Sequence, residues 1–256
     1  MLTVNNVSKT YSGKMAYRAL EDVSFDVKES EYVGIMGPSG SGKTTLLNIV
    51  ATIDSPTSGS VLLDGKSPHE LKEKELSSFR AKQLGFVFQN FQLLDTLTVA
   101  ENIVLPLTLD GQQSIEEMKQ SVEEISLKLG IDDLLDKRTY ELSGGQLQRT
   151  AIARALIHQP RLLLADEPTG NLDSKASGDV MNMLNKMNQE ERTTILMVTH
   201  DPVVASYCDR ILFIKDGKLF NEIYKGDNRE AFYQNVVQVL SLMGGDNRDL
   251  SSVRLS

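Results

Sequence analysis

A glycine-rich segment constrains the fold of this chain more than any other feature. Its residues form a complete G-x-x-x-x-G-K-[ST] loop, Gly37-Pro38-Ser39-Gly40-Ser41-Gly42-Lys43-Thr44. In such a loop, bare backbone N–H groups close around phosphate oxygens, and the helix that follows points its positive end at the same phosphates. The apolar run 32–36 and the helical pattern 43–51 supply the strand and the helix that the loop requires. The alternative, a chance turn rich in glycine and serine, does not account for the full pattern in that context.

Three side chains at the start of this helix supply chemistry that the backbone lacks. Lys43 brings a full positive charge to the β- and γ-phosphates, and the Thr44 hydroxyl is an oxygen ligand suited to Mg²⁺. Thr45, the next hydroxyl, is included in the predicted nucleotide site. We therefore predict that this loop binds a nucleoside triphosphate together with magnesium.

The composition narrows the class of protein around this loop. The chain has 256 residues, a net charge of −8 and one cysteine, Cys208. This length fits one large domain or one domain with subdomains, and the lack of a cysteine pair fits a reducing compartment. A nucleic-acid binder is more often basic, so we expect no nucleic-acid partner. The sequence has neither an apolar run of membrane-spanning length nor a basic start before an apolar stretch, which argues against a membrane span and against secretion.

Short apolar runs alternate with helical patterns along most of the chain. Strand candidates occupy 23–27, 32–36, 60–65, 84–88, 162–165 and 195–198, and a hairpin occupies 211–220. This alternation predicts an α/β fold with a mostly parallel sheet, and the helical texture of about 90–158 predicts an inserted subdomain. Apolar residues at helical spacing from Phe232 to Met243 predict a C-terminal amphipathic helix. The polar residues that follow it predict a mobile tail.

A second glycine-bearing segment begins another predicted helix, which extends from Gln146 to Leu156. A hydroxyl followed by bare N–H groups at a helix N-terminus forms an anion site. The alternative is an ordinary helix cap, but Arg149 and the run 153–155 make the whole pattern more specific than a cap requires. The segment is Leu142-Ser143-Gly144-Gly145-Gln146.

Two carboxylates follow the apolar run 162–165, a pattern typical of a strand that is covered on both faces. At the end of such a strand, Asp166 is placed to hold Mg²⁺ through water, and Glu167 to polarise an attacking water as a general base. The alternative is a solvated acidic strand end. That alternative would prevail for the pair alone, but the phosphate loop in the same chain favours the catalytic interpretation.

Three single residues complete the candidate site. His200 follows the strand 195–198 and is placed to bond a terminal phosphate or to hold Glu167, although a lone histidine is more often structural. Gln89 follows the strand 84–88, from which its amide can reach the metal ion or the attacking water. Tyr11 either stacks on a base or packs at the end of a strand, and the sequence leaves both alternatives open.

Taken in chain order, these places resemble the ATP-binding cassette of ABC transporters. Tyr11 is similar to the adenine-stacking aromatic residue, residues 37–44 to the Walker A loop, Gln89 to the Q-loop and 142–146 to the family signature. Asp166 and Glu167 resemble the Walker B carboxylate and the catalytic glutamate, and His200 resembles the switch histidine. Asn171-Leu172-Asp173 resembles the D-loop, which places Asp173 at the nucleotide. The resemblance covers about 1–226 and is carried by several specific motifs.

This resemblance implies a fold, cofactors and partners. The fold is a RecA-like P-loop NTPase core of α/β class, with a mostly parallel sheet, a small antiparallel β subdomain and an inserted α-helical subdomain. The ligands are ATP and Mg²⁺, which Thr44, Gln89 and Asp166 would hold. Two copies would pair head to tail as a homodimer around ATP. Each would bind a membrane permease at the cytoplasmic face of the cell membrane as a peripheral subunit.

Within the family, three segments resemble the branch of macrolide exporters, lipoprotein releasers and peptide-antibiotic resistance ATPases. They are 90–102, 170–174 and 199–207. The region after Phe232 is most similar to the bacitracin-type resistance ATPases, whereas the Gly170-Asn171 pair is closer to the macrolide and lipoprotein members. An ATPase of a non-transport complex, such as a regulator of cell-wall hydrolases in division, stays an alternative. A soluble cassette of translation or repair ranks last, because those proteins usually carry two cassettes.

The role of the chain beyond the cassette stays open at this stage. We assign 1–226 to the nucleotide-binding domain and 227–256 to the C-terminal helix and tail. The apolar stripe of that helix would dock either on a second copy or on the permease.

Overall fold

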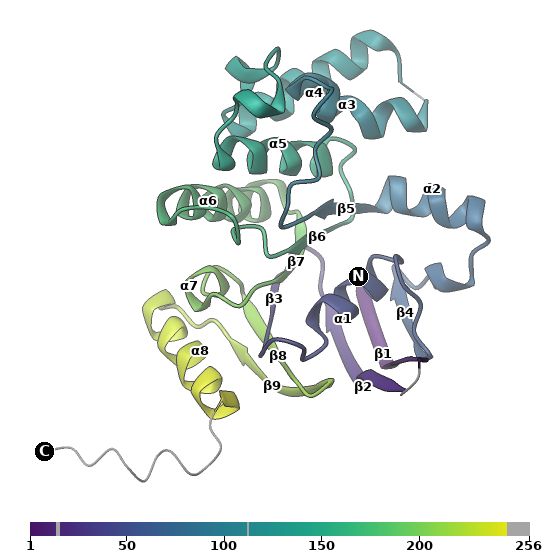
Figure 1. Cartoon of the computed structure of the whole chain (residues 1–256), viewed down its shortest axis with the longest axis vertical. Helices are drawn as coiled ribbons and strands as arrows, with labels where there is room; N and C mark the ends of the chain where they lie inside the picture. The colour runs from purple at the N-terminus through teal and green to yellow at the C-terminus, as the bar shows by residue number, and fades with distance from the viewer. Residues whose placement is uncertain (14–15, 112, 245–256) are drawn as a thin grey trace, which may run out of the picture.

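Two sheets and the helices around them make up the computed structural model, which describes residues 1–13, 16–111 and 113–244 (Figure 1). The strands are β1 (Leu2–Tyr11), β2 (Tyr17–Val27), β3 (Tyr32–Met36), β4 (Ser58–Leu63), β5 (Leu84–Val87), β6 (Leu162–Asp166), β7 (Thr194–Val198), β8 (Arg210–Lys215) and β9 (Lys218–Tyr224). The helices are α1 (Lys43–Val50), α2 (Glu73–Gln83), α3 (Val99–Asp110), α4 (Ile115–Leu129), α5 (Gly144–Leu156), α6 (Ser174–Glu191), α7 (Pro202–Ala205) and α8 (Arg229–Gly244). Short 3₁₀ turns lie at Pro68–Glu70, Asp132–Leu134 and Thr139–Glu141.

The larger sheet has the strand order β5-β6-β7-β3-β8-β9, in which only β9 is antiparallel to its neighbour. The smaller sheet, β2-β1-β4, is antiparallel. The predicted fold class is therefore confirmed. The central strands β6, β7 and β3 are parallel neighbours, so their carboxyl ends meet at one edge of the sheet, where ligands bind in such folds.

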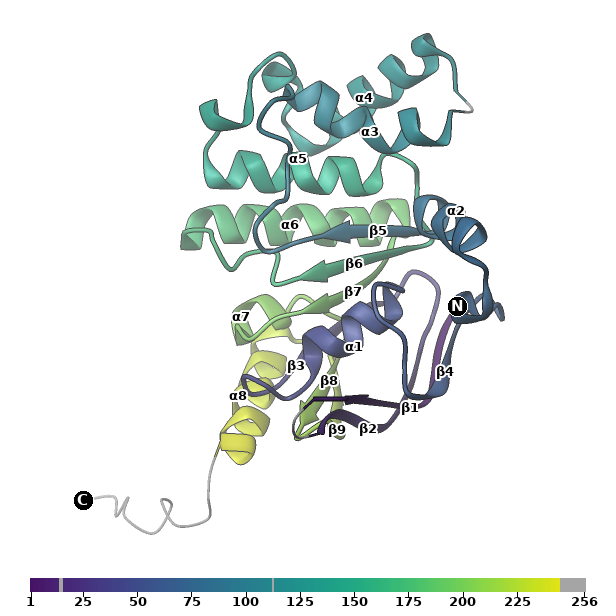
Figure 2. The same ribbon diagram turned by 45° about the vertical axis from the view of Figure 1, so that its right-hand side comes forward.

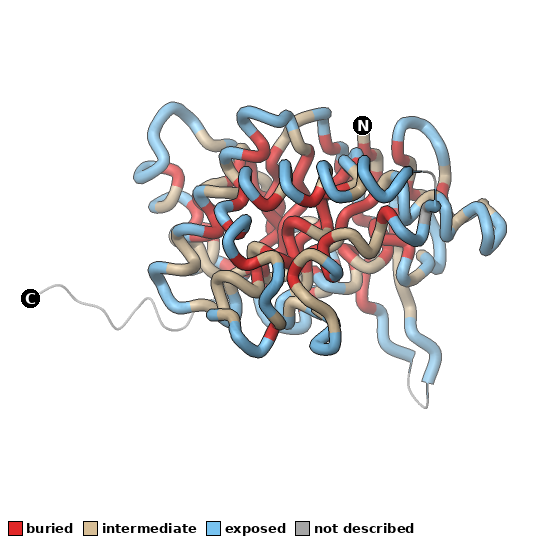
Figure 3. The backbone as a smooth tube through the Cα atoms, turned by 90° about the horizontal axis from the view of Figure 1, so that it is seen from above, coloured by how far each residue is buried: buried red, intermediate tan, exposed pale blue. Residues whose placement is uncertain are grey.

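Strand β3 is buried along its whole length because its side chains alternate between two cores. Tyr32 and Met36 face the core that helices α3 to α8 cover, and Val33 and Ile35 face the core beneath α1 and the small sheet. The same alternation divides Leu163 and its neighbours in β6. Figure 3 shows the resulting buried backbone running through the middle of the molecule. A continuous apolar run is what such two-sided burial requires.

Helices α3, α4 and α5 form the inserted helical subdomain, with α5 lying between α6 and the other two helices (Figure 2). Capping boxes begin α3 and α4, where Thr98 pairs with Glu101 and Ser114 with Glu117. Each satisfies two backbone N–H groups that the helix start leaves unpaired. Helix α4 ends at Gly130, whose φ of 62° is the left-handed conformation of a helix C-terminus.

Helix α8 carries the predicted apolar stripe, but the stripe packs inside its own chain. Phe232, Val236, Val239 and Met243 are buried in the same core as α7. The rest of the chain therefore covers this stripe, and the docking of the C-terminal helix on a second copy or on a permease stays a prediction. The tail predicted to be mobile is 244–256; Gly244 is the last residue of α8, and 245–256 lies outside the described residues. Neither α8 nor any other helix within the described ranges has the length and apolar character of a membrane span.

Because Phe232 is only 1% exposed, we expect the substitution Phe232→Ala to lower the free energy of unfolding by about 3–5 kcal/mol, through lost burial and the cavity left behind. Chemical denaturation followed by circular dichroism measures this loss. Leu242→Ala on the same helix is the matched control, since Leu242 is 59% exposed, and it should change stability little. Equal losses in the two variants would contradict the packing described for α8.

Candidate functional site

The glycine-rich loop leaves β3 at Gly37 and enters α1 at Lys43, as the sequence predicts. Gly37 has a φ of 154°, and a Cβ there would lie 2.0 Å from the carbonyl oxygen of Ile214 on β8. Gly42 has a φ of 104°, and its Cβ would lie 2.5 Å from the carbonyl oxygen of Ala19 on β2. Both positions therefore require glycine, and they pin the loop between the two sheets.

Inside the loop, the Lys43 side chain is folded across the backbone. Its ammonium group donates to the carbonyl oxygens of Gly37 at 2.9 Å and of Pro38 at 2.8 Å, which leaves a third N–H for an anion. Burial lowers the pKa of Lys43, and the nearby carboxylates of Glu167 and Asp166 oppose that shift. The Coulombic coupling places these two carboxylates next to the loop. Lys43 is therefore a positive charge held on the floor of the cradle.

The Ser41 hydroxyl is a buried polar group without a hydrogen-bond partner among the described residues. Buried polar atoms are nearly always bonded, so this one indicates a ligand that the loop is built to receive. The neighbouring loop residues Pro38, Ser39 and Gly40 are exposed, as is Thr44, whereas Thr45 is half-buried. Solvent therefore reaches the predicted phosphate-binding loop at Pro38, Ser39, Gly40 and Thr44.

The carboxylates predicted to serve catalysis lie at the carboxyl end of β6, beside the end of β7. Asp166 ends β6, and the Glu167 N–H donates to Val198 O at the end of β7, at 2.9 Å. Glu167 has a φ of 47°, a left-handed conformation that is uncommon outside glycine and aims its side chain away from the strand. The Nδ1 atom of His200 lies 3.0 Å from Glu167 Oε1, so the predicted contact between these residues is present.

The pKa of Asp166 is raised above its usual value, chiefly by burial and secondarily by the like charge of Glu167. The attraction of Lys43 works in the opposite direction and is the smallest of the three causes. The folded chain therefore holds the ionised form of Asp166 at a cost. Such a cost is typical of a functional carboxylate that a cation later stabilises.

Gln89 begins an irregular segment between β5 and α3, and the turn after β6 holds the start of that segment. The Asn171 side-chain amide donates to Gln89 O at 2.9 Å and to Asn90 Oδ1 at 2.8 Å. Gly170 lies directly against the Gln89 amide, because a Cβ at that glycine would be 2.8 Å from Gln89 Nε2.

Arg154 of α5 fixes the next two residues, a role that the sequence analysis missed. Its guanidinium donates to Phe91 O at 3.0 Å and to Gln92 O at 2.6 Å, and both residues have left-handed φ values, 57° and 51°. The available signal was a charged residue on the otherwise small and apolar face 151–156 of a predicted helix. That signal indicates an arginine that is partly covered by its neighbours without revealing its partner.

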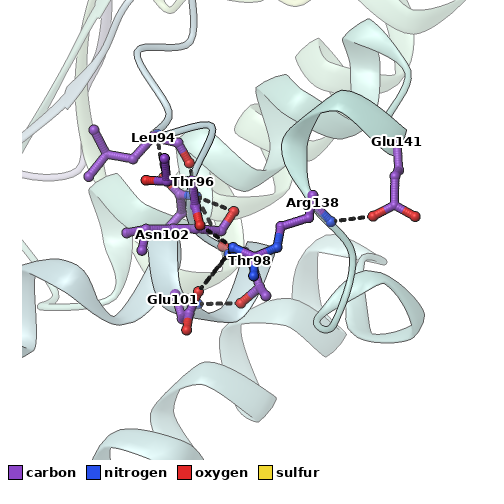
Figure 4. A network of polar contacts seen from close by, with 8 residues as sticks. Leu94, Thr96, Thr98, Glu101, Asn102, Arg138 and Glu141 are labelled. Carbon is purple, nitrogen blue, oxygen red and sulfur yellow. Dashed lines mark hydrogen bonds and ion pairs between the residues drawn. The ribbon is translucent and has the colours of Figure 1, made fainter.

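A polar network holds the rest of this segment against the helical subdomain (Figure 4). The Asn102 side chain accepts from Leu94 N at 2.8 Å and donates to Leu94 O at 3.1 Å. Arg138 donates to Thr96 O, and its own N–H donates to Glu141 at 2.6 Å. Segment 89–98 thus has a fixed path although it has no regular secondary structure.

The second glycine-bearing segment begins α5, as predicted. The Ser143 hydroxyl accepts from the N–H of Gln146, whose side chain bonds back to Ser143 N at 2.9 Å. A Cβ at Gly144 would lie 3.3 Å from Leu172, and one at Gly145 would lie 3.2 Å from Ala176, so bare backbone borders the start of α6 here. No hydrogen bond or ion pair among the described residues joins 143–146 to the phosphate loop.

Asp173 begins α6 as its N-cap, where its carboxylate accepts from Ala176 N at 2.9 Å. Within this chain the carboxylate therefore serves a helix start, and its predicted contact with nucleotide stays a prediction.

Tyr11 lies at the end of β1 and is 41% exposed. Its hydroxyl donates to Asp54 at 2.8 Å, and the Lys9 ammonium lies 4.9 Å from the ring centroid. Burial and the bond to Asp54 raise the pKa of Tyr11, whereas the Thr45 hydroxyl at the start of α1 opposes them. Tyr17, its cross-strand partner, donates to Gly40 O at 3.2 Å and was missed by the sequence analysis.

Comparisons with known proteins give consistent matches. The family described as "ABC transporter" matches residues 20–170. The chain is 60% identical to the ABC transporter ATP-binding protein YxdL of Bacillus subtilis, over 100% of this chain and 99% of that one. It is 46% identical to the bacitracin export ATP-binding protein BceA of Halalkalibacterium halodurans, over 97% and 99%. The dimeric post-hydrolysis structure of the ATP-binding cassette MJ0796 of Methanocaldococcus jannaschii, bound to ADP and Pi, has a TM-score of 0.81 and 42% identity and covers 89% of this chain and 100% of its own.

The raised pKa of Asp166 leads to a pH-dependent prediction for the protein without nucleotide. A carboxyl whose pKa is higher in the folded state destabilises the fold as pH rises from its unfolded value, about 3.9, through the raised value. Asp166→Asn removes the buried charge, so we expect it to raise the thermal unfolding temperature at pH 7. The gain should shrink as the pH falls toward about 4.

Thermal unfolding of the two proteins between pH 4 and pH 8 measures this difference. The exposed substitution Asp227→Asn is the control, and it should leave the unfolding temperature unchanged. A lower unfolding temperature for Asp166→Asn at every pH would refute the assigned electrostatic cost.

Proposed function

The chain belongs to the ABC transporter family as an ATP-binding cassette with ATPase activity, and from this premise we propose that it powers export of, or resistance to, bacitracin-like antimicrobial peptides. The main support is the extent of its match to the bacitracin export ATPase BceA, which covers 97% of this chain and 99% of that relative. The cassette MJ0796 covers only 89% of this chain although all of MJ0796 is matched. The match to BceA therefore includes residues of this chain that lie outside the part that MJ0796 matches.

We assign ATP to the cradle between β3 and α1. The Gly37–Thr44 backbone would surround the phosphates, Lys43 would supply charge through its third N–H, and Ser41 would gain the partner that it lacks among the described residues. Thr45 lies beside the same phosphates at the start of α1. Tyr11, exposed beside that start, provides a ring face for the adenine.

Magnesium fits the oxygen ligands of the same site. Thr44 and Asp166 offer a hydroxyl and a carboxylate, and Gln89 offers an amide oxygen, which suits a cation that keeps much of its shell as water and phosphate oxygens. Among the described residues no group of three or more His, Cys, Asp and Glu side chains could hold a metal ion by itself. A bound Mg²⁺ would neutralise charge on the phosphates.

Glu167 is the proposed general base for hydrolysis. His200 bonds its Oε1 atom at 3.0 Å, which holds the carboxylate in place and leaves Oε2 to accept a proton from the attacking water. The left-handed φ of Glu167 and its N–H bond to Val198 fix the direction of the side chain. Gln89 is proposed to orient the water or the metal ion.

Two copies of the chain are proposed to form the working unit as a homodimer. The anion site at Ser143, Gly144 and Gly145 lacks polar contacts to the phosphate loop of the described chain, so a second copy would bring it to the ATP. Gln146 caps the same helix start. Asp173 is the N-cap of α6, and the first turn of α6 borders Gly145 at Ala176. The dimeric structure of MJ0796 supports this arrangement.

A membrane permease is the proposed partner, which would hold the chain at the cytoplasmic face of the membrane as a peripheral subunit. The alternative, an ATPase that drives a non-transport membrane complex, requires the same site and differs only in that partner. The adjoining gene product would separate them, since a permease with a large extracellular domain favours peptide-antibiotic resistance.

We expect Glu167→Gln to lower the rate of ATP hydrolysis by about 10²- to 10⁴-fold, because the amide keeps the shape of the carboxylate but accepts no proton. The same variant should bind ATP and accumulate as an ATP-dependent dimer. Phosphate release and light scattering measure the two effects. Glu116→Gln, an exposed change in the first turn of α4, is the control. Hydrolysis at the parent rate would refute the general-base assignment.

We expect deletion of the gene to make cells more sensitive to bacitracin-type peptides, and the parent gene but not Glu167→Gln to restore growth. The physical reason is that ATP hydrolysis at this site would supply the energy for resistance. Growth at graded peptide concentrations measures the effect. Unchanged sensitivity to such peptides, combined with a division defect, would favour the non-transport alternative.

A further inference from the structure

The turn that follows Glu167 touches Gln89 in two independent ways. We propose that Gly170 and Asn171 are positioning residues that form a seat for Gln89 and so set its place at the nucleotide. This inference rests on the proposed role of Gln89 in hydrolysis. It adds two residues of the same chain that hold Gln89 in position for that role.

Gly170 provides the floor of the seat. A Cβ at this position would lie 2.8 Å from Gln89 Nε2 and 3.3 Å from its Cγ and Cδ atoms. The colliding atoms belong to the end of a flexible, exposed side chain, so a methyl group at 170 would displace the Gln89 amide and leave the backbone in place. Gly170 also has no left-handed φ, which means that alanine adopts its backbone conformation without strain.

Asn171 provides the wall of the seat. Its amide donates one hydrogen bond to the Gln89 carbonyl at 2.9 Å and another to Asn90 Oδ1 at 2.8 Å. Both N–H groups of one amide thus hold the backbone and the neighbouring side chain at the point where Gln89 projects. An aspartate of the same shape would put a carboxylate oxygen in the place of this amide nitrogen, opposite the two acceptor oxygens, and would lose both hydrogen bonds.

The backbone beyond the seat is held separately, by Arg154. Because its guanidinium bonds Phe91 O and Gln92 O, the segment after Asn90 has an anchor of its own on α5. Displacement of the Gln89 amide therefore need not unravel the segment. The turn that carries Asn171 and Asp173 is proposed to face the second copy. Through the seat, this turn contacts Gln89, which is proposed to lie at the ATP of the same chain.

The test is a double-substitution cycle in the full-length chain, with Mg²⁺-ATP as the probe. Gly170→Ala should lower kcat about 5- to 10-fold, since misplacement of a catalytic group by about 1 Å costs up to about 100-fold. The KM for ATP and the thermal unfolding temperature should change little. Gly178→Ala is the matched control, because Gly178 lies within α6 and a Cβ there would meet nothing within 4 Å.

The decisive comparison uses Gln89→Ala, which removes the side chain that the new methyl group would strike. If the seat acts through Gln89, then Gly170→Ala and Asn171→Asp should each cause no further loss in the Gln89→Ala background. An equal loss from Gly170→Ala with and without Gln89 would overturn the inference. So would an unchanged kcat for Gly170→Ala where Gln89→Ala alone lowers kcat.

The same cycle separates the inference from the proposed function on which it rests. Parent-like hydrolysis and magnesium dependence in Gln89→Ala would refute the assigned role of Gln89, and the seat would lose its purpose with it. Loss in Gln89→Ala without loss in Gly170→Ala leaves that role standing and refutes the seat alone.

Discussion

The turn at Gly37 is the constraint on which the rest of the site depends. The carbonyl oxygen of Ile214 leaves no room for a Cβ there, and Ala19 does the same at Gly42, so the loop is held between the large and small sheets. Since β3 lies between β7 and β8, and β6 lies beside β7, the same register brings Asp166, Glu167 and His200 to the edge where the loop begins. The order of the parallel strands therefore decides which side chains meet the phosphates.

The meeting of these strand ends brings together charged groups whose ionised forms the fold alone does not favour. Burial lowers the pKa of Lys43 and raises that of Asp166, so both shifts disfavour the charged forms, and Ser41 Oγ has no hydrogen-bond partner in the described part of the chain. Glu167 adds a left-handed backbone conformation. Costs of this kind gather where a ligand later supplies the missing interactions. A magnesium-bound triphosphate, the ligand proposed for this site, would offer both: anionic oxygens for Lys43 and Ser41, and a cation for Asp166.

The sequence predicted those elements whose pattern is local. The buried strands β3, β6 and β7 and the starts of α1 and α5 follow from apolar runs and glycine motifs. Strand β1 was missed because a bulge between Val4 and Val7, with Asn6 at a φ of 47°, breaks its alternation. Helix α2 was missed because it buries none of its residues and so has no apolar stripe. For α8 the stripe was visible, but a stripe does not reveal which surface covers it.

Contacts of Gln89 were beyond sequence reasoning for a related reason. The segment from Gln89 to Thr98 lacks regular secondary structure, so its backbone carbonyls depend on side chains from distant elements. Asn171, Arg154 and Asn102 provide donors, and Arg138 adds another at Thr96 (Figure 4). Three of these donors belong to the helical subdomain or its connections, and Asn171 belongs to the turn after β6. Because one irregular segment is bonded to both, a movement of the helical subdomain against the sheet would alter the bonds around Gln89.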